Sequence, residues 1–236
     1  MALASRVVAC RAVRRRTRCG RWRLLAGTIP RCIAVSVNNG DPKIPPAADP
    51  GQAERLVLAA RRPVTLIGLM GAGKSSIGKR LADRLGLPFV DADDEIVLAA
   101  GLSIPEIFER FGEAHFRDGE RRVIARLIDG SPKVIATGGG AFMNDETRAL
   151  ILARTLGVWL DADIATLVER VRRRGGRPLL AGRDPGQVLR ELAAVRSPVY
   201  ALAPIRIASK AGPHGDTVEA IITALAAANS NSGALP

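Results

Sequence analysis

The sequence predicts an α/β fold in which helices flank a five-stranded parallel sheet. Short apolar stretches alternate with segments of helical periodicity, a pattern typical of parallel strands joined by crossover helices. The expected strands are Val64–Gly68, Pro88–Val90, Val134–Thr137, Val158–Asp161 and Ile205–Ala208. About forty residues of helical pattern separate the second strand from the third, which predicts a cap over the ligand crevice at the carboxyl ends of the strands. The expected apolar faces of this cap are Ile104, Ile107, Phe108 and Phe111 on one helix and Val123, Ile124, Leu127 and Ile128 on the next.

A glycine-rich loop follows the first expected strand. Residues Gly68–Ser75 fit the phosphate-binding pattern G-x-x-x-x-G-K-[ST] at every position. The apolar, β-branched stretch Pro63–Ile67 precedes the loop, and Ile77, Leu81 and Leu85 follow it as one stripe at helical spacing. Because strand, loop and helix come in the order that this pattern requires, we predict a P-loop rather than a chance glycine-rich turn.

The predicted loop implies a nucleotide site. Its glycines let backbone N–H groups close around phosphate oxygens, and the start of the helix adds the positive end of its dipole. We expect Lys74 to reach the β- and γ-phosphates of ATP and Ser75 to ligate Mg²⁺. The expected ATP-binding residues of the loop are Gly71, Ala72, Gly73, Lys74, Ser75 and Ser76.

Carboxylates end the second expected strand. Alternate residues at a strand end point the same way, so Asp91 and Asp93 can share the crevice, one toward metal-bound water and one toward an acceptor hydroxyl. Aspartate also caps helix N-termini well, so helix capping is an alternative that is compatible with a functional role.

Three glycines, Gly138–Gly140, follow the third expected strand. They allow main-chain N–H groups to approach a small ligand closely, although a plain flexible loop has the same composition.

Three separated arginines complete the set of candidates: Arg117, Arg177 and Arg196. A single arginine is usually a solvated surface charge. Planar guanidinium groups bind carboxylates and phosphates bidentately, however, so a kinase for a small anionic acceptor needs arginines of this kind.

Taken in order from about Thr65 to Ala208, these motifs resemble those of the shikimate kinases, small P-loop kinases of aromatic amino-acid biosynthesis. The matching motifs are Gly-Leu-Met-Gly-Ala-Gly-Lys-Ser, Asp-Ala-Asp, Phe-Arg-x-x-Glu, Gly-Gly-Gly-Ala, Arg-Pro-Leu-Leu and Arg-x-Pro-x-Tyr. The resemblance implies a five-stranded fold like that of nucleoside monophosphate kinases, with an acceptor-binding cap and a mobile lid.

The same resemblance implies roles for the candidate residues. Asp93 would hold the ring hydroxyls of shikimate, and Arg117 and Arg196 would clamp its carboxylate. Gly138, Gly139 and Gly140 would bind shikimate through their backbone. Arg177 would close on the ATP phosphates from a lid at about 175–186, and Asp91 would support Mg²⁺ through water. The expected catalytic residues are therefore Lys74, Asp93 and Arg177. Which residues contact adenine is left open, because neither Arg172–Arg174 nor Lys210–His214 aligns securely with the family.

The positive charge of the chain is concentrated at its N-terminus. Residues 1–40 hold nine of the 35 basic residues and no acidic ones, and the remaining 26 basic residues face all 23 acidic ones. All three cysteines also lie there, so no cysteine-based site is available to the folded body. We expect a disordered leader and proline-rich linker at 1–52, a kinase-like domain at 53–227 with its cap at about 93–128, and a disordered tail at 228–236. An unstructured extension or over-long start, a transit peptide and a polyanion-binding arm all fit the leader.

The expected activity is phosphorylation of the shikimate 3-hydroxyl by MgATP, by a cytoplasmic monomer without nucleic-acid or membrane partners. An organelle is the alternative location if the leader is a transit peptide. One rival function is another small P-loop kinase, for gluconate or a nucleotide, with a different cap. The other is a nucleic-acid or membrane-surface binding protein that acts through its basic leader.

Overall fold

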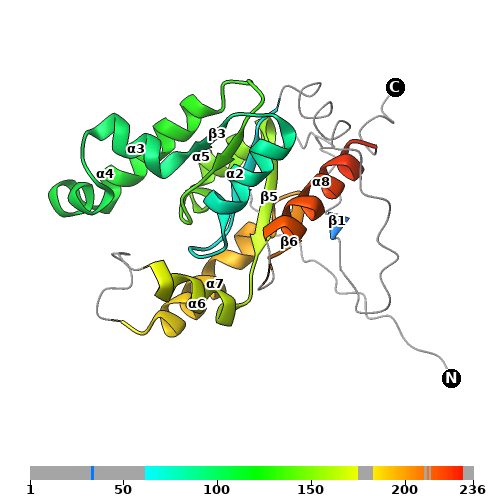
Figure 1. The fold of residues 1–236 in the computed structure, drawn as a ribbon. Helices are drawn as coiled ribbons and strands as arrows, with labels where there is room; N and C mark the ends of the chain where they lie inside the picture. The colour runs from blue at the N-terminus through cyan, green and yellow to red at the C-terminus, as the bar shows by residue number, and fades with distance from the viewer. Residues whose placement is uncertain (1–32, 35–61, 175–182, 210–211, 213, 231–236) are drawn as a thin grey trace, which may run out of the picture. The chain divides into compact units, whose positions relative to one another are not determined.

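A parallel sheet organises the molecule, which we describe from a computed structural model at residues 33–34, 62–174, 183–209, 212 and 214–230 (Figure 1). Its strands are β1 (Ile33–Ala34), β2 (Val64–Ile67), β3 (Phe89–Asp91), β4 (Val134–Ala136), β5 (Leu156–Asp161) and β6 (Ile205–Ala208). They lie in the order β1-β6-β5-β2-β4-β3, and every neighbouring pair is parallel. The prediction of a five-stranded parallel sheet flanked by helices is confirmed by β2 to β6.

The sheet differs from the sequence prediction in small ways. β5 begins at Leu156, two residues earlier than predicted, while Gly68 and Thr137 lie just outside β2 and β4. β1 was not predicted at all. It pairs Ile33 with Ile205 and Ala34 with Arg206 at the edge of β6, and two residues are too few to give a period-two pattern.

Burial explains the composition of the strands. β2 is central and buried at all four positions, because helices cover both faces of the sheet around it. β6 alternates between buried and exposed positions, and its Arg206 faces solvent. The pattern of apolar and polar residues in β2 and β6 therefore depends on how far each strand lies from the centre of the sheet.

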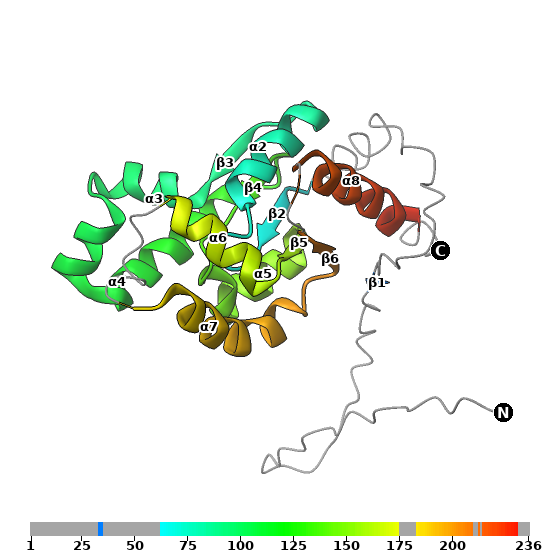
Figure 2. The same ribbon diagram turned by 60° about the horizontal axis from the view of Figure 1, so that its bottom comes forward.

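Helices connect the strands and cover the sheet (Figure 2). They are α2 (Lys74–Leu85), α3 (Ala92–Ala100), α4 (Ile104–Leu127), the 3₁₀ turn η1 (Ala141–Met143), α5 (Asp145–Arg154), α6 (Ile164–Arg174), α7 (Pro185–Tyr200) and α8 (His214–Ser230). α2 packs against α8, and its predicted stripe of Ile77, Leu81 and Leu85 is buried. α8 continues three residues beyond the expected end of the domain at 227, to Ser230. None of the described helices is long and apolar enough to cross a membrane.

The cap consists of α3 and α4, which project from the β3 side of the sheet (Figures 1 and 2). A capping box between Ser103 and Glu106 begins α4. Gly112 interrupts this helix with φ 78° and ψ 173°, so the helical register changes there. Phe111, expected on the apolar face, is consequently 53% exposed, whereas Ile107 and Val123 are buried.

Candidate active site

The P-loop is built from backbone conformations that favour glycine. Gly68, Gly71 and Gly73 all have positive φ, at 145°, 83° and 93°. A Cβ on Gly68 would lie 2.6 Å from the carbonyl oxygen of Leu160 in the neighbouring strand. The loop therefore needs glycine at position 68 both for its backbone conformation and for its packing against β5.

Lys74 begins α2 directly after this loop. Its Nζ donates hydrogen bonds to the carbonyl oxygens of Gly68, at 2.8 Å, and Leu69, at 3.0 Å. The side chain thus curls back over the loop, and its ammonium group lies against the backbone of the P-loop.

Ser75 and Asp91 join the P-loop to the end of β3. The Ser75 hydroxyl donates to Oδ2 of Asp91 at 2.6 Å, and the other oxygen, Oδ1, accepts from the backbone N–H of Asp93 at 3.1 Å. Asp91 is consequently the N-cap of α3 and the partner of the P-loop serine at once. The capping alternative is correct for Asp91, and the functional interpretation remains compatible with it.

Asp93 lies in the first turn of α3 and faces Gly138. A Cβ on Gly138 would lie 3.0 Å from Oδ1 of Asp93 and 2.5 Å from Oε1 of Glu120. Position 138 therefore tolerates only glycine without rearrangement of two acidic side chains.

Arg117 and Arg196 approach the glycine loop from opposite elements. Arg117, on α4, pairs with Glu120 at 2.7 Å and Glu113 at 3.1 Å, and its Nη1 would be 2.5 Å from a Cβ on Gly140. Arg196, on α7, donates from Nη1 to the carbonyl oxygen of Gly139 at 3.0 Å. Two guanidinium groups from α4 and α7 thus converge on Gly139 and Gly140.

Glu120 is a member of the site to which the sequence analysis assigned no role. Its side chain is 3% exposed, and in the described part of the chain its Oε1 has no hydrogen-bond partner. Burial raises the pKa of the Glu120 carboxyl, although the charge of Arg117 opposes the shift. Burial lowers the pKa of the Arg117 guanidinium, but the charges and hydrogen bonds of Glu120 and Glu113 outweigh burial, so the net shift of this pKa is upward. The signal was present in the sequence, because Glu120 is the last residue of the Phe-Arg-x-x-Glu motif, three positions after Arg117.

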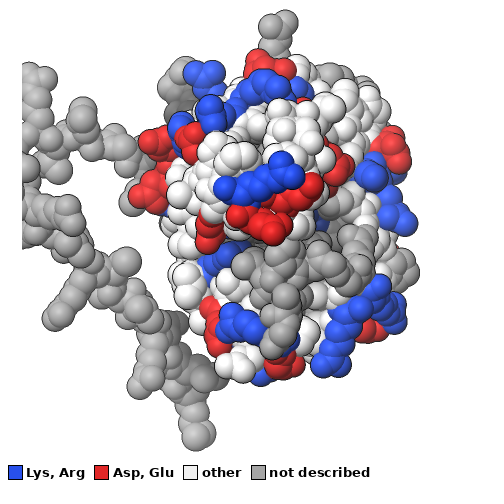
Figure 3. All heavy atoms as spheres, turned by 90° about the vertical axis from the view of Figure 1, so that its left-hand side faces the viewer, with Lys and Arg blue, Asp and Glu red and all other residues white. Residues whose placement is uncertain are grey.

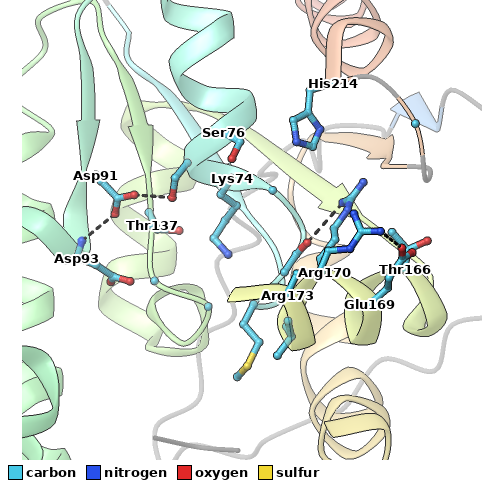
Figure 4. A pocket seen from close by; sticks show the side chains of 18 residues that line it. Lys74, Ser76, Asp91, Asp93, Thr137, Thr166, Glu169, Arg170, Arg173 and His214 are labelled. Carbon is cyan, nitrogen blue, oxygen red and sulfur yellow. Dashed lines mark hydrogen bonds and ion pairs between the residues drawn. The ribbon is translucent and has the colours of Figure 1, made fainter. Parts of the chain in front are cut away.

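A cavity of about 390 Å³ joins the P-loop to the glycine loop (Figure 4). The P-loop lines it with Gly71, Gly73, Lys74, Ser75 and Ser76. One side is lined by Asp91, Asp93, Thr137, Gly138 and Gly139. The other side is lined by Thr166, Glu169, Arg170, Arg173, Gly212 and His214. Arg170 is another residue that sequence reasoning missed. Its Nη1 lies 3.4 Å from the carbonyl oxygens of Gly71 and Ala72 and 3.2 Å from Oγ of Ser209, contacts that no local motif reveals.

Arg177 lies outside the described residues, as does Gly182 of the expected lid. Of that lid, Asp184 is the N-cap of α7, and Pro185 and Gly186 form the first turn of the helix. Among the described residues, no three His, Cys, Asp or Glu side chains cluster in a way that could hold a metal ion.

A parallel sheet with a P-loop after its central strand, a helical cap and a cavity that joins the two defines a small P-loop kinase. A sequence profile of the shikimate kinases matches residues 70–226. A shikimate kinase of Bradyrhizobium diazoefficiens is 54% identical over 187 residues, which are 79% of this chain and 90% of the relative. One of Zymomonas mobilis is 58% identical over 164 residues, 70% of this chain and 93% of the relative. The chain therefore belongs to the shikimate kinase family.

Solved structures agree with this assignment. A shikimate kinase from Acinetobacter baumannii in complex with shikimate superposes with a TM-score of 0.68 at 35% identity, covering 74% of this chain and 96% of that one. A shikimate kinase from Aquifex aeolicus gives a TM-score of 0.61 at 33% identity over 73% of this chain and 99% of that one. The fold prediction is thus confirmed at the level of the family.

Proposed function

We propose that this chain transfers the γ-phosphoryl group of ATP to the 3-hydroxyl of shikimate, giving shikimate 3-phosphate and ADP in aromatic amino-acid biosynthesis. Membership in the family supports this reaction. The observation that supports it most directly is the shared cavity, because Lys74 and Ser75 line it together with Asp93 and Gly138. A phosphoryl donor on the P-loop and an acceptor on the glycine loop would therefore meet in one cavity.

In this proposal, the two ends of the cavity have different occupants. The phosphates lie on the P-loop, the acceptor lies toward Asp93, and the base of the nucleotide lies toward Arg170 and His214, which line the opposite end (Figure 4). Arg117 and Arg196 bind the acceptor carboxylate, since both guanidinium groups converge on the loop from Gly138 to Gly140.

Phosphoryl transfer needs little covalent help from protein, so positioning and charge neutralisation are the expected contributions. Lys74 offsets charge on the transferred group. Asp93 orients the attacking hydroxyl and accepts its proton late in the reaction, because a loose transition state requires little general-base help. Arg177 belongs to this proposal through its sequence motif alone.

The residues near the P-loop fit Mg²⁺. The hydroxyl of Ser75 and the carboxylate of Asp91 are hard oxygen donors 2.6 Å apart, and Mg²⁺ is usually held by one or two such groups together with phosphates and water. We propose that Ser75 binds the ion directly and Asp91 through water. When bound, Mg²⁺ neutralises phosphate charge.

We further propose that the protein is a cytoplasmic monomer. The bacterial relatives support a cytoplasmic location and give the organellar alternative no support. On the face shown in Figure 3, basic and acidic side chains are interspersed, which does not favour a polyanion-binding surface on that face.

Mg²⁺-dependent release of ADP by the full chain tests the proposed reaction, with shikimate, gluconate and AMP offered separately. We expect turnover with shikimate alone, and its loss in Asp93→Asn. Turnover with gluconate or AMP instead would contradict the proposed acceptor while keeping the P-loop assignment. Turnover with shikimate that survives Asp93→Asn would remove Asp93 from the acceptor site.

A further inference from the structure

The last residue of α7, Tyr200, is completely enclosed beside the glycine loop. Its side chain is 1% exposed, and its ring lies 6.4 Å from that of Phe142 and 6.1 Å from that of Trp159. Its hydroxyl donates a hydrogen bond to the carbonyl oxygen of Gly139. Burial raises the pKa of this phenol, against the opposing charge of Arg196, so the hydroxyl keeps its proton and remains a donor at neutral pH.

Arg196 donates to the same carbonyl oxygen. It precedes Tyr200 by one turn of α7, and its Nη1 lies 3.0 Å from the oxygen of Gly139. A carbonyl oxygen has two acceptor sites, and the two donors occupy both. One of these two donors, Arg196, is also needed by the proposed reaction to bind the acceptor. The other donor, Tyr200, has no such second task.

An acceptor carboxylate would draw on the hydrogen-bond donors of Arg196, one of which is engaged with the carbonyl oxygen of Gly139. A guanidinium that turns toward a carboxylate gives up or shares its bond to Gly139, and a half-buried carbonyl left without a donor costs about 1–3 kcal/mol. With Tyr200 in place, the carbonyl keeps one hydrogen bond throughout. Without the Tyr200 hydroxyl, Arg196 would be the one side-chain donor to this oxygen among the residues that the structure describes, and binding of an acceptor carboxylate would compete with that bond.

We infer that Tyr200 is a positioning residue for the acceptor: it holds the carbonyl of Gly139 so that Arg196 can turn its guanidinium onto a carboxylate. This inference rests on the proposed function, since it requires an acceptor with a carboxylate. It assigns Tyr200 an effect on acceptor affinity, with no contact to the reacting atoms.

Tyr200→Phe tests this inference in the full chain, because it removes the hydroxyl and keeps the packed ring. We expect the KM for shikimate to rise about 5- to 20-fold, which corresponds to about 1–2 kcal/mol, while kcat and the KM for ATP stay within about twofold. The matched control is Thr155→Val, which removes another buried hydroxyl-to-carbonyl bond, from Oγ1 of Thr155 to the oxygen of Ile151 at 2.8 Å, outside the cavity. It should lower the melting temperature comparably and leave both KM values unchanged.

The methyl ester of shikimate separates this role from general loop packing, since it offers Arg196 no carboxylate. Tyr200→Phe should raise the KM for shikimate and leave that for the ester within about twofold of the unsubstituted protein. An equal rise for both acceptors, or an unchanged KM for shikimate, would overturn the inference. No shikimate turnover by the unsubstituted protein would instead overturn the proposed function.

Discussion

The P-loop and the acceptor side of the cavity are held in place by different means. The P-loop is mostly backbone from one short segment: positive φ angles at Gly71 and Gly73, and a lysine that hydrogen-bonds to carbonyls five and six residues before it. The acceptor side is made of charged side chains from α3, α4 and α7, gathered around three glycines. The first can be recognised from adjacent residues, whereas the second exists only when distant elements pack together.

The largest effect should come from the P-loop. Lys74→Ala removes the ammonium group proposed to stabilise charge on the transferred phosphoryl group, so kcat should fall about 10²- to 10³-fold or more. Single-turnover kinetics with saturating ATP and shikimate measure this directly. Lys79→Ala, an exposed lysine of the same helix, is the control and should keep full activity. Full activity in Lys74→Ala would remove Lys74 from the phosphate site.

Arg117→Ala tests the acceptor side of the cavity. The KM for shikimate should rise about 10- to 100-fold through loss of a charge-assisted contact, while the KM for ATP changes little. The variant leaves Glu120 without its ion pair, so its melting temperature must be measured as well. Arg121→Ala, on the solvent side of the same helix, provides the control. An unchanged KM for shikimate in folded Arg117→Ala would refute the carboxylate clamp.

Glycine substitutions sharpen the contrast between backbone strain and crowding. Gly140 has ordinary helical angles, φ −97° and ψ −16°, but an added Cβ would meet Arg117 at 2.5 Å. Gly140→Ala should therefore shift Arg117 and raise the KM for shikimate several-fold, with the KM for ATP retained. Gly73→Ala strains a position with φ 93°, at a cost of about 1–2 kcal/mol, and should raise the KM for ATP instead. Steady-state kinetics with each substrate varied would reveal the reverse pattern if the two regions were assigned wrongly.

The smallest effect concerns the dependence of stability on pH. The pKa of Glu120 is raised above 4.5 in the folded protein by burial, with Arg117 and Arg196 opposing the shift and Asp93 adding to it. A raised carboxyl pKa contributes stability that is fully present below pH 4.5 and is lost as pH rises through the folded pKa, at up to about 1.4 kcal/mol per pH unit.

Urea unfolding of the original chain and of Glu120→Gln, at several pH values above 4.5, measures that dependence. The difference in unfolding free energy, original minus variant, should decrease with pH until Glu120 is ionised. Titrating groups that do not interact with Glu120 are common to both proteins and cancel. A difference that stays flat or grows with pH would show that Arg117 outweighs burial.

The sequence predicted the features that depend on neighbouring residues. The P-loop pattern, the five strands and the family were all evident, because glycine spacing and apolar runs are local signals. The roles of Asp93, Arg117 and Arg196 stay predictions, although the structure brings all three to the glycine loop. The break at Gly112, by contrast, needed backbone geometry, since an isolated glycine is compatible with a continuous helix.

Residues whose importance is tertiary were missed. Glu120 looks like a surface glutamate on a helix until its burial against Gly138 is seen, and Arg170 looks like one of several arginines on α6. In the sequence, Tyr200 stands out only as the end of a motif, because its partner Gly139 lies 61 residues away. The motif that contains Glu120 marks the residue but not its burial, and the contacts of all three residues depend on how α4, α6 and α7 pack.

β1 has a consequence for the behaviour of shortened chains in solution. Because Ile33 and Ala34 pair with β6, a protein trimmed to begin after them leaves backbone donors and acceptors of β6 open along the sheet edge. Open edges of this kind pair readily with strands from other molecules. The exposed charge of Arg206 on that strand then opposes such pairing. Replacing Arg206 by an apolar residue in a trimmed chain would therefore favour self-association.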